Sequence, residues 1–302
     1  MIEYNAERSH SSLGYMTPHE FVKEYVAMSQ EQRLRLNMEK EMKIPYYQVD
    51  VFTDRLFKGN PAGVCLLMSG WPADELMQQI AFENNLSETA FVLRQGGSFE
   101  LRWFTPTIEV DLCGHATVAP AHVLFKETGL DGNLIEFTTK SSGIVSVERK
   151  GDRLILDFPS RPPVTCETPR ELEETLGNKP VEIWRSRDYL MVFDNEDEIR
   201  NMNPDLVRML NWDCLGVIVT APGKTVDFVS RFFAPRAGVN EDPVTGSSHS
   251  TLIPYWAKRL KKTELHAVQL SSRGGELFCQ DAGDRVKIGG NSVTYSRGEI
   301  NV

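Results

Sequence analysis

The chain has 302 residues, of which 41% are hydrophobic and 25% charged, and its formal net charge is −9. This length suits two domains of ordinary size, and the composition is typical of a soluble globular protein. A net negative charge argues against nucleic acid as the main partner of the core, since binding to phosphates requires a basic surface. No apolar run is long enough to span a membrane, and the first residues lack the apolar core of a signal peptide. Five scattered cysteines without CxxC spacing favour reduced thiols and a cytoplasmic location.

Residues 1–41 differ from the rest of the chain. Tyr4–Pro18 is polar and rich in turn residues, Glu20–Met28 has a helical pattern, and Ser29–Glu41 is highly charged. Tyr4–Pro18 resembles the extreme C-terminal tail of IS3-type insertion-sequence transposases, although Ser9 replaces the usual proline and nothing of a transposase catalytic core is present. We therefore expect residues 1–41 to be an appended remnant, with a nucleic-acid-binding arm as the alternative.

From Pro45 onwards, short alternating stretches predict strands, and amphipathic or apolar stretches predict helices. In the first half we expect helices over Pro72–Asn84 and Val118–Phe125, and strands over Tyr46–Phe52, Val64–Met68, Leu86–Leu93, Leu134–Thr138, Ile144–Arg149 and Arg153–Phe158. In the second half we expect helices over Pro169–Leu176, Asp205–Leu210 and Thr251–Leu260, and strands over Val181–Arg185, Tyr189–Phe193, Gly216–Thr220, Phe228–Ala234, Ala267–Leu270, Glu276–Gln280, Arg285–Gly289 and Val293–Ile300. Because strands and helices do not alternate strictly, the predicted fold class is α+β.

Two of the predicted helices contain a proline, Pro120 in the first half and Pro254 in the second. A proline inside a helix removes one backbone hydrogen bond. Either each helix kinks there, or the residues before the proline form an irregular first turn. The sequence leaves both possibilities open.

One stretch of the chain occurs twice, about 130 residues apart. It runs from Arg102 to Thr117 and again from Arg231 to His249, with Arg, Phe, Pro, Val and Gly in the same order and three extra residues before the second glycine. Each copy predicts a strand, a proline-containing loop, a turn of small residues and an apolar helix. Such a turn presents N–H groups at a helix N-terminus, where an anion is stabilised. We infer a duplicated domain whose two turns face one cleft across a pseudo-two-fold axis.

Three polar residues near these turns are candidates for chemistry. Glu88 lies in an apolar strand, so a cleft closing over it would desolvate the carboxylate, as removal of a carbon-bound proton requires; a solvent-facing residue on an edge strand is the alternative. His115 follows the first turn glycine, where a histidine is more often a polar contact than a catalyst, and His122 is expected to be structural. Asp242 precedes the second turn, although Asp before Pro is also a common turn choice. Glu241 is expected to be an exposed neighbour.

Four motifs in this order resemble the PhzF family. They are Asn60-Pro61-Ala62-Gly63, Leu86-Ser87-Glu88-Thr89, Phe104-Thr105-Pro106 with Cys113-Gly114-His115-Ala116-Thr117, and Glu241-Asp242-Pro243-Val244-Thr245-Gly246-Ser247. Members of this family are phenazine-biosynthesis-type isomerases with the diaminopimelate-epimerase fold. The resemblance covers Met42–Val302 and implies two pseudo-symmetric domains, each a curved sheet around a central helix, with the active site between them. It also suggests a homodimer.

The proline-rich stretch Pro159–Pro169 is the predicted domain boundary. It divides the chain into an extension over residues 1–41, an N-terminal domain over 42–160 that residues 290–302 complete, and a C-terminal domain over 161–289.

The resemblance implies roles for several residues. Glu88 matches the general acid/base of the family, while His115 and Asp242 would position the substrate and assist the proton transfer. Gly114, Gly246 and Ser247 would hold a substrate carboxylate.

Cysteine chemistry and bound cofactors are not expected. Related racemases of this fold use two opposed cysteines, but here Cys113 is matched by Thr245, whose hydroxyl is a poor substitute for a thiolate. Cys113 is therefore expected to be a packing residue. The sequence contains neither a phosphate-binding loop nor a histidine spacing typical of a metal site, so we expect no cofactor and no metal.

The leading hypothesis is a cofactor-independent isomerase that transfers a proton on a small carboxylate-bearing metabolite. Three alternatives remain open: an amino-acid or hydroxy-acid epimerase or racemase, a metabolite-binding protein without catalysis, and a transposition accessory acting through residues 1–41.

Overall fold

The computed structural model describes residues 17–27 and 42–302. Contacts divide the chain into two compact units, one of residues 1–44 and 299–302 and the other of residues 45–298. The first unit contains helix α2 (Pro18–Ala27), which begins with a capping box. Thr17 Oγ1 accepts a hydrogen bond from the Glu20 N–H at 3.2 Å, while the Thr17 N–H donates to Glu20 Oε2 at 2.9 Å. The helix predicted after Thr17 is confirmed, whereas the other residues of the predicted remnant, 1–16 and 28–41, lie outside the described residues.

The strands form one 17-stranded sheet. In chain order they are β1 (Lys43–Val51), β2 (Asn60–Leu67), β3 (Glu88–Gln95), β4 (Ser98–Phe104), β5 (Glu109–Val110), β6 (Leu134–Thr139), β7 (Ile144–Lys150), β8 (Arg153–Pro159), β9 (Val164–Thr165), β10 (Glu182–Arg185), β11 (Tyr189–Val192), β12 (Val217–Pro222), β13 (Phe228–Phe233), β14 (Glu264–Gln269), β15 (Gly275–Asp281), β16 (Arg285–Gly290) and β17 (Ser292–Asn301).

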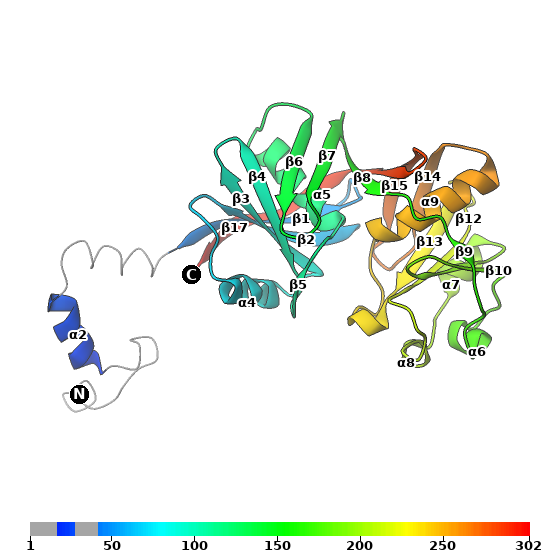
Figure 1. The fold of residues 1–302 in the computed structure, drawn as a ribbon, viewed down its shortest axis with the longest axis horizontal. Helices are drawn as coiled ribbons and strands as arrows, with labels where there is room; N and C mark the ends of the chain where they lie inside the picture. The colour runs from blue at the N-terminus through cyan, green and yellow to red at the C-terminus, as the bar shows by residue number, and fades with distance from the viewer. Residues whose placement is uncertain (1–16, 28–41) are drawn as a thin grey trace. The chain divides into compact units, whose positions relative to one another are not determined.

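The helices that follow α2 differ greatly in length and burial. They are α4 (Asp74–Asn84), α5 (His115–His122), the π-helix η2 (Val123–Glu127), α6 (Leu172–Leu176), α7 (Glu196–Asn201), α8 (Leu206–Met209), the 3-10 helix η3 (Pro235–Ala237) and α9 (Gly246–Leu260). All eight residues of α5 are buried, which makes it a central helix (Figure 1). Helix α7 was not predicted, although Asn195 caps it by accepting a hydrogen bond from the Glu198 N–H. Within the described part of the chain, no helix is long and apolar enough to cross a membrane.

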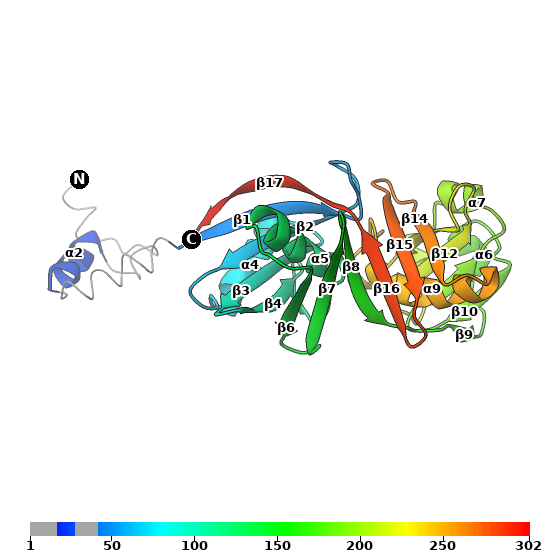
Figure 2. The same cartoon turned by 90° about the horizontal axis from the view of Figure 1, so that it is seen from above.

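Strand pairing follows the same order in both halves. In the first half β1–β2 is antiparallel, β2–β3 parallel, β3–β4 antiparallel, β4–β6 parallel, and β6–β7 and β7–β8 antiparallel. In the second half β10–β11, β11–β12, β12–β13, β13–β14, β14–β15 and β15–β16 repeat that order of directions. The last strands of the two series, β8 and β16, pair antiparallel with each other (Figure 2). The duplication inferred from the sequence is therefore visible in the topology.

Each half places one helix against its strands. Helix α5 contacts β2, β3, β7 and β8, while α9 contacts β14, β15 and β16 and also β8 of the first half (Figure 1). Apolar side chains of both helices, including Val118 and Trp256, belong to one continuous buried core. A smaller core around Phe193 and Trp212 lies in the second half. The terminal strand β17 pairs with β1.

Pro120 and Pro254 lie inside α5 and α9, not at the end of an irregular first turn. A proline at position i leaves the carbonyl of residue i−4 without its helical donor. The freed carbonyl of Ala116 accepts a hydrogen bond from Trp103 Nε1 at 3.0 Å. The freed carbonyl of Ser250 accepts one from the Arg161 N–H at 2.9 Å. Each proline therefore creates an acceptor that attaches its helix to another part of the fold.

Candidate active site

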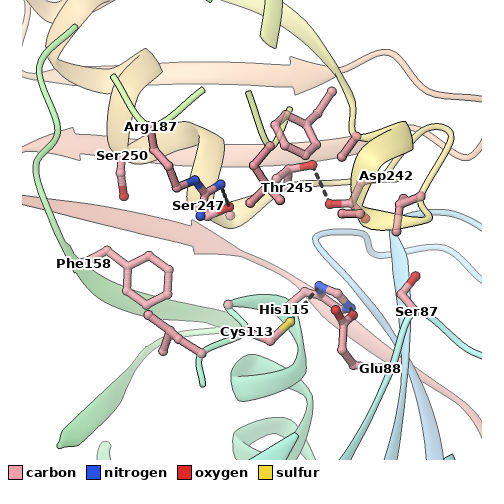
Figure 3. Close-up of a pocket in the computed structure, with 18 of the residues that line it drawn as sticks. Ser87, Glu88, Cys113, His115, Phe158, Arg187, Asp242, Thr245, Ser247 and Ser250 are labelled. Atoms are coloured by element: carbon pink, nitrogen blue, oxygen red, sulfur yellow. Dashed lines mark hydrogen bonds and ion pairs between the residues drawn. The ribbon is translucent and has the colours of Figure 1, made fainter. Parts of the chain in front are cut away.

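A pocket of about 490 Å³ lies at the N-terminal ends of α5 and α9. Its lining brings together all six residues that the sequence assigned to a site, Glu88, Gly114, His115, Asp242, Gly246 and Ser247. Figure 3 shows the side chains of the first turn facing those of the second across this pocket. The size is within the range of pockets that enclose small metabolites.

The two glycine turns lie against each other. A Cβ atom built on Gly246 would lie 3.7 Å from the Cα of Gly114. Position-matched side chains support both turns, since Thr117 Oγ1 donates to the Cys113 carbonyl at 2.5 Å and His249 Nδ1 lies 2.8 Å from the Thr245 carbonyl. Two helix N-termini thus converge on one pocket, where their N–H groups and helix dipoles favour a negatively charged ligand group.

Glu88 and His115 form the polar centre of the first half. Glu88 begins β3, and its Oε2 lies 3.1 Å from His115 Nε2; the side chains are 18% and 5% exposed. The two atoms are at ion-pair distance, and neither of these buried atoms has a hydrogen-bond partner among the described residues. Buried polar atoms without partners are rare and costly, and here both belong to residues that line the pocket.

The charge state of His115 depends on its neighbours. Burial alone would lower the pKa of His115, but Cys113 and Glu88 raise it well above its usual value. Burial, and next the charge of Glu88, raise the pKa of the Cys113 thiol, whose Sγ lies 3.6 Å from His115 Nδ1. Since a protonated thiol carries no charge, Glu88 is the neighbour that supports a positively charged imidazolium.

Asp242 occupies the second-half side of the pocket. Its Oδ1 accepts a hydrogen bond from Asn60 Nδ2 at 2.8 Å, and its Oδ2 accepts one from Thr245 Oγ1 at 2.5 Å. Burial raises the pKa of Asp242 to about 6, although His115 and these hydrogen bonds act in the opposite direction. Asp242 therefore changes charge close to neutral pH.

Asn60 joins the two halves of the site, a role that its motif did not reveal. Its Nδ2 donates to Asp242 Oδ1 and, at 2.9 Å, to the Val244 carbonyl, and it lies 3.2 Å from His115 Nδ1. The available signal was the preceding Gly59, which has φ +65° and where an added Cβ would lie 2.1 Å from the Val51 carbonyl oxygen. Such a constrained turn fixes the direction of the next side chain.

Glu241 is not the exposed neighbour that we expected. Its two oxygens accept hydrogen bonds from Arg231 Nε at 2.6 Å and Nη2 at 3.0 Å. The first repeat contains the matching pair, in which Arg102 donates to Glu109 at 2.6 and 2.8 Å. These paired ions hold the loop before each turn, so the residue next to Asp242 has a structural partner. His122 also lies outside the lining of the pocket, and its Nε2 is 3.0 Å from Thr294 Oγ1.

Among the residues that the structure describes, Glu88, Cys113 and His115 have donor atoms that lie close enough together, within 4.8 Å, to consider a metal ion. Cys113 approaches Nδ1 of the imidazole, however, while Glu88 approaches Nε2. The imidazole therefore lies between the thiol and the carboxylate, as a path for a proton along the ring requires, while one donor atom from each of the three residues is also within reach of a single ion.

Comparison with known proteins gives consistent results. Residues 49–298 match the family described as phenazine biosynthesis-like protein. A Pseudomonas aeruginosa protein named as an uncharacterized isomerase is 51% identical over 262 residues, covering 86% of this chain and all of that protein. A human phenazine biosynthesis-like domain-containing protein is 39% identical, covering 86% of this chain and 99% of that one.

Solved structures show the same relationship. An Enterococcus faecalis protein of the PhzF family superposes with a TM-score of 0.84 at 46% identity, covering 86% of this chain and all of the other. A hydroxyproline epimerase from Agrobacterium vitis has a TM-score of 0.55 at 10% identity over 86% of this chain and 93% of its own, a likeness of fold alone. The mixed α/β fold is therefore the one shared by PhzF proteins and this epimerase.

Proposed function

Because the chain belongs to the phenazine biosynthesis-like, or PhzF, family, and relatives of about 50% identity are named isomerases, we propose that it transfers a proton on a small carboxylate-bearing metabolite in the described pocket. One observation carries this proposal. Glu88 Oε2 and His115 Nε2 are buried, have no hydrogen-bond partner among the described residues, and belong to a pocket at two helix N-termini. A substrate held there would satisfy these atoms.

The proposed reaction uses side chains of the chain itself. The carboxylate of the substrate binds at the N–H groups of Gly114, Gly246 and Ser247. The Glu88 carboxylate takes a proton from a carbon atom of the substrate, and the electron pair moves towards the substrate carboxylate as an enolate-like charge. The turn N–H groups and the cationic His115 stabilise that charge, while Asp242 holds the substrate through its own hydrogen-bond network. In a substrate with a carbon–carbon double bond conjugated to this charge, the electron pair shifts along the double bond. Glu88, after exchanging its carboxyl proton with solvent, then protonates the far carbon atom of that double bond, which gives the isomer.

The domain division at Pro159–Pro169, the homodimer and the cytoplasmic location belong to this proposal. The repeated order of strand pairing and the β1–β17 pairing support two similar domains over residues 42–160, completed by 290–302, and 161–289.

The alternatives predict different products. An epimerase or racemase would exchange the α-hydrogen and lose optical rotation, because the proton returns to the same carbon from the other face. A binding protein would be stabilised by its ligand and would exchange no hydrogen. The isomerase would gain deuterium in D2O at a carbon atom other than the one that loses its proton.

Incubation with pooled small carboxylic acids in D2O tests the proposal, with mass spectrometry and NMR to locate the label. The Glu88→Gln variant should bind the metabolite but place no deuterium in it, since the amide cannot accept the proton. Unchanged exchange in this variant would remove Glu88 from the mechanism.

A further inference from the structure

The pocket also contains two arginines to which the proposed mechanism gives no role. Arg161 and Arg187 both belong to its lining. In Figure 3, Arg187 lies beside Ser247 on the side of Phe158, while Glu88 and Asp242 lie on the opposite side. The pocket therefore has an acidic side, where we place proton transfer, and a basic side.

Arg187 occupies the position in the second half that Asn60 occupies in the first. Ala62, two residues after Asn60, pairs with the first residue of β3, and Tyr189, two residues after Arg187, pairs with the first residue of β12. Their contacts match as well. Asn60 Nδ2 lies 3.2 Å from His115, and Arg187 Nη2 donates to Ser247 Oγ at 3.3 Å. His115 and Ser247 each follow a turn glycine, so the duplication has placed a neutral amide on one side and a cation on the other.

Arg187 is held in place but still has free donors. Its Nε and Nη2 donate to Asp188 Oδ2 at 3.0 and 2.7 Å, and the Asp188 side chain is 4% exposed. Among the described residues, Nη1 has no hydrogen-bond partner, and the Arg187 side chain is 39% exposed. Asp188 thus fixes the guanidinium plane, while Nη1 remains available to a ligand.

Arg161 supplies the net positive charge of this side. Its N–H donates to the Ser250 carbonyl that Pro254 leaves free, which attaches the backbone of Arg161 to α9 beside the pocket. Within the described part of the chain, its guanidinium has no acidic partner within salt-bridge distance. Arg161, Arg187 and Asp188 together carry one net positive charge, while the acidic residues of the pocket lining are Glu88, Asp111 and Asp242.

We propose that Arg161 and Arg187 bind a second anionic group of the substrate, so that this enzyme acts on dicarboxylic metabolites. The inference rests on the proposed function, which places the first carboxylate at the glycine turns. The N–H groups of those turns already match the acceptor sites of one carboxylate, and two guanidinium groups exceed what it can use. Repulsion from Glu88 and Asp242 would keep a second anion away from the acidic side, which leaves the side of the two arginines.

Matched pairs of ligands test this inference without knowledge of the substrate. The probes are malonate, succinate and glutarate, each compared with its monoamide, which has nearly the same shape and one negative charge fewer. Dissociation constants are measured by calorimetry at fixed ionic strength. We expect wild type to bind at least one diacid about 10-fold or more tightly than its monoamide, the size of effect that a charge-assisted hydrogen bond produces.

Variants assign this preference to the two arginines. Arg161→Gln and Arg187→Gln should each reduce the ratio between diacid and monoamide towards one. Because Arg187→Gln leaves the buried Asp188 without its cation, the double variant Arg187→Gln/Asp188→Asn is tested beside it. Arg55→Gln, at a side chain that is 83% exposed, is the control and should retain the full ratio.

Two sets of results overturn the inference. Equal binding of diacid and monoamide in every pair, including no binding of either, contradicts it, and so does a preference that survives both arginine substitutions. The Glu88→Gln variant separates this test from that of the proposed function. If its diacid preference is intact and proton exchange in wild type does not depend on Glu88, the catalytic proposal fails while the charge recognition stands.

Discussion

Asp242 is the residue whose environment most directly links structure to pH. The Asp242 carboxylate is ionised when it accepts hydrogen bonds from Asn60 Nδ2 and Thr245 Oγ1. A protonated Asp242 carboxyl would itself be a hydrogen-bond donor, facing two groups that also donate. Burial raises its pKa to about 6, so this network is complete above pH 6 and disrupted below it. These two hydrogen bonds indicate that the charge of Asp242 affects the rate of turnover.

We therefore predict that deuterium exchange by wild type rises with pH through about 6 and then levels off. The Asp242→Asn variant should be slower and should lack this inflection, because its side chain does not titrate. Asp213→Asn, at a side chain that is 97% exposed, should reproduce the wild-type profile. An unchanged inflection in Asp242→Asn would assign the titration to another group.

The sequence identified candidate site residues, but it did not identify the side chains that they contact. Glu88, His115 and Asp242 were recognisable because each stands in a motif or beside a repeated turn. The contact of Asn60 with Asp242 spans 182 positions, and that of Arg187 with Ser247 spans 60. Which side chains meet over such separations is decided by strand order, which residue patterns do not specify.

In the two helices that contain a proline, α5 and α9, donors from other parts of the chain replace a missing helical hydrogen bond. Trp103, which is 1% exposed, donates to the carbonyl that Pro120 frees in α5. A phenylalanine at this position would leave that buried carbonyl without a donor, which costs about 1–3 kcal/mol in addition to the lost packing.

We predict that Trp103→Phe lowers the free energy of unfolding less in a Pro120→Ala background than in wild type. Alanine restores the N–H that bonds to the Ala116 carbonyl, so the indole donor is no longer needed. Denaturant titration of the two single variants and the double variant measures this coupling. Strict additivity would show that the indole hydrogen bond does not compensate for the proline.

Helix α9 contains a buried histidine that makes the fold sensitive to acid. Burial lowers the pKa of His249 to about 4, whereas the unfolded chain has the usual value of 6.5. The unfolded state therefore takes up the proton first, so the stabilisation is complete above pH 6.5 and is lost as pH falls towards 4. At 1.36 kcal/mol for each pKa unit, the difference between the folded and unfolded pKa values of His249 contributes about 3 kcal/mol to the free energy of unfolding.

For His249→Gln we predict a weaker dependence of unfolding free energy on pH between 6.5 and 4. Because glutamine does not titrate, the slope of the unfolding free energy against pH should decrease by the equivalent of up to one bound proton. This decrease is expected whatever effect the substitution has on stability at pH 7. Urea unfolding at several pH values measures this slope. Identical slopes in wild type and variant would mean that His249 is not the group that resists protonation.

The duplication of the chain could be predicted from the sequence, but the way its strands pair could not. The repeat around Arg102 and Arg231 indicated two similar halves, and most strands and helices occur close to their predicted ranges. Parallel pairings such as β4–β6 and β13–β14 join strands with a helix between them, and local alternation says nothing about such partners. The hydrogen bonds at the two prolines could not be predicted from the sequence either. The carbonyl groups that Pro120 and Pro254 leave free accept hydrogen bonds from residues of other elements.

Proton transfer by Glu88 in this pocket is tested by the rate of deuterium incorporation into the metabolite that exchanges. We predict that Glu88→Gln lowers this rate by about 100-fold or more, the usual contribution of a general acid/base, while Glu83→Gln on the exposed side of α4 leaves it unchanged. A Glu88→Gln rate within about twofold of wild type would show that another group carries the proton.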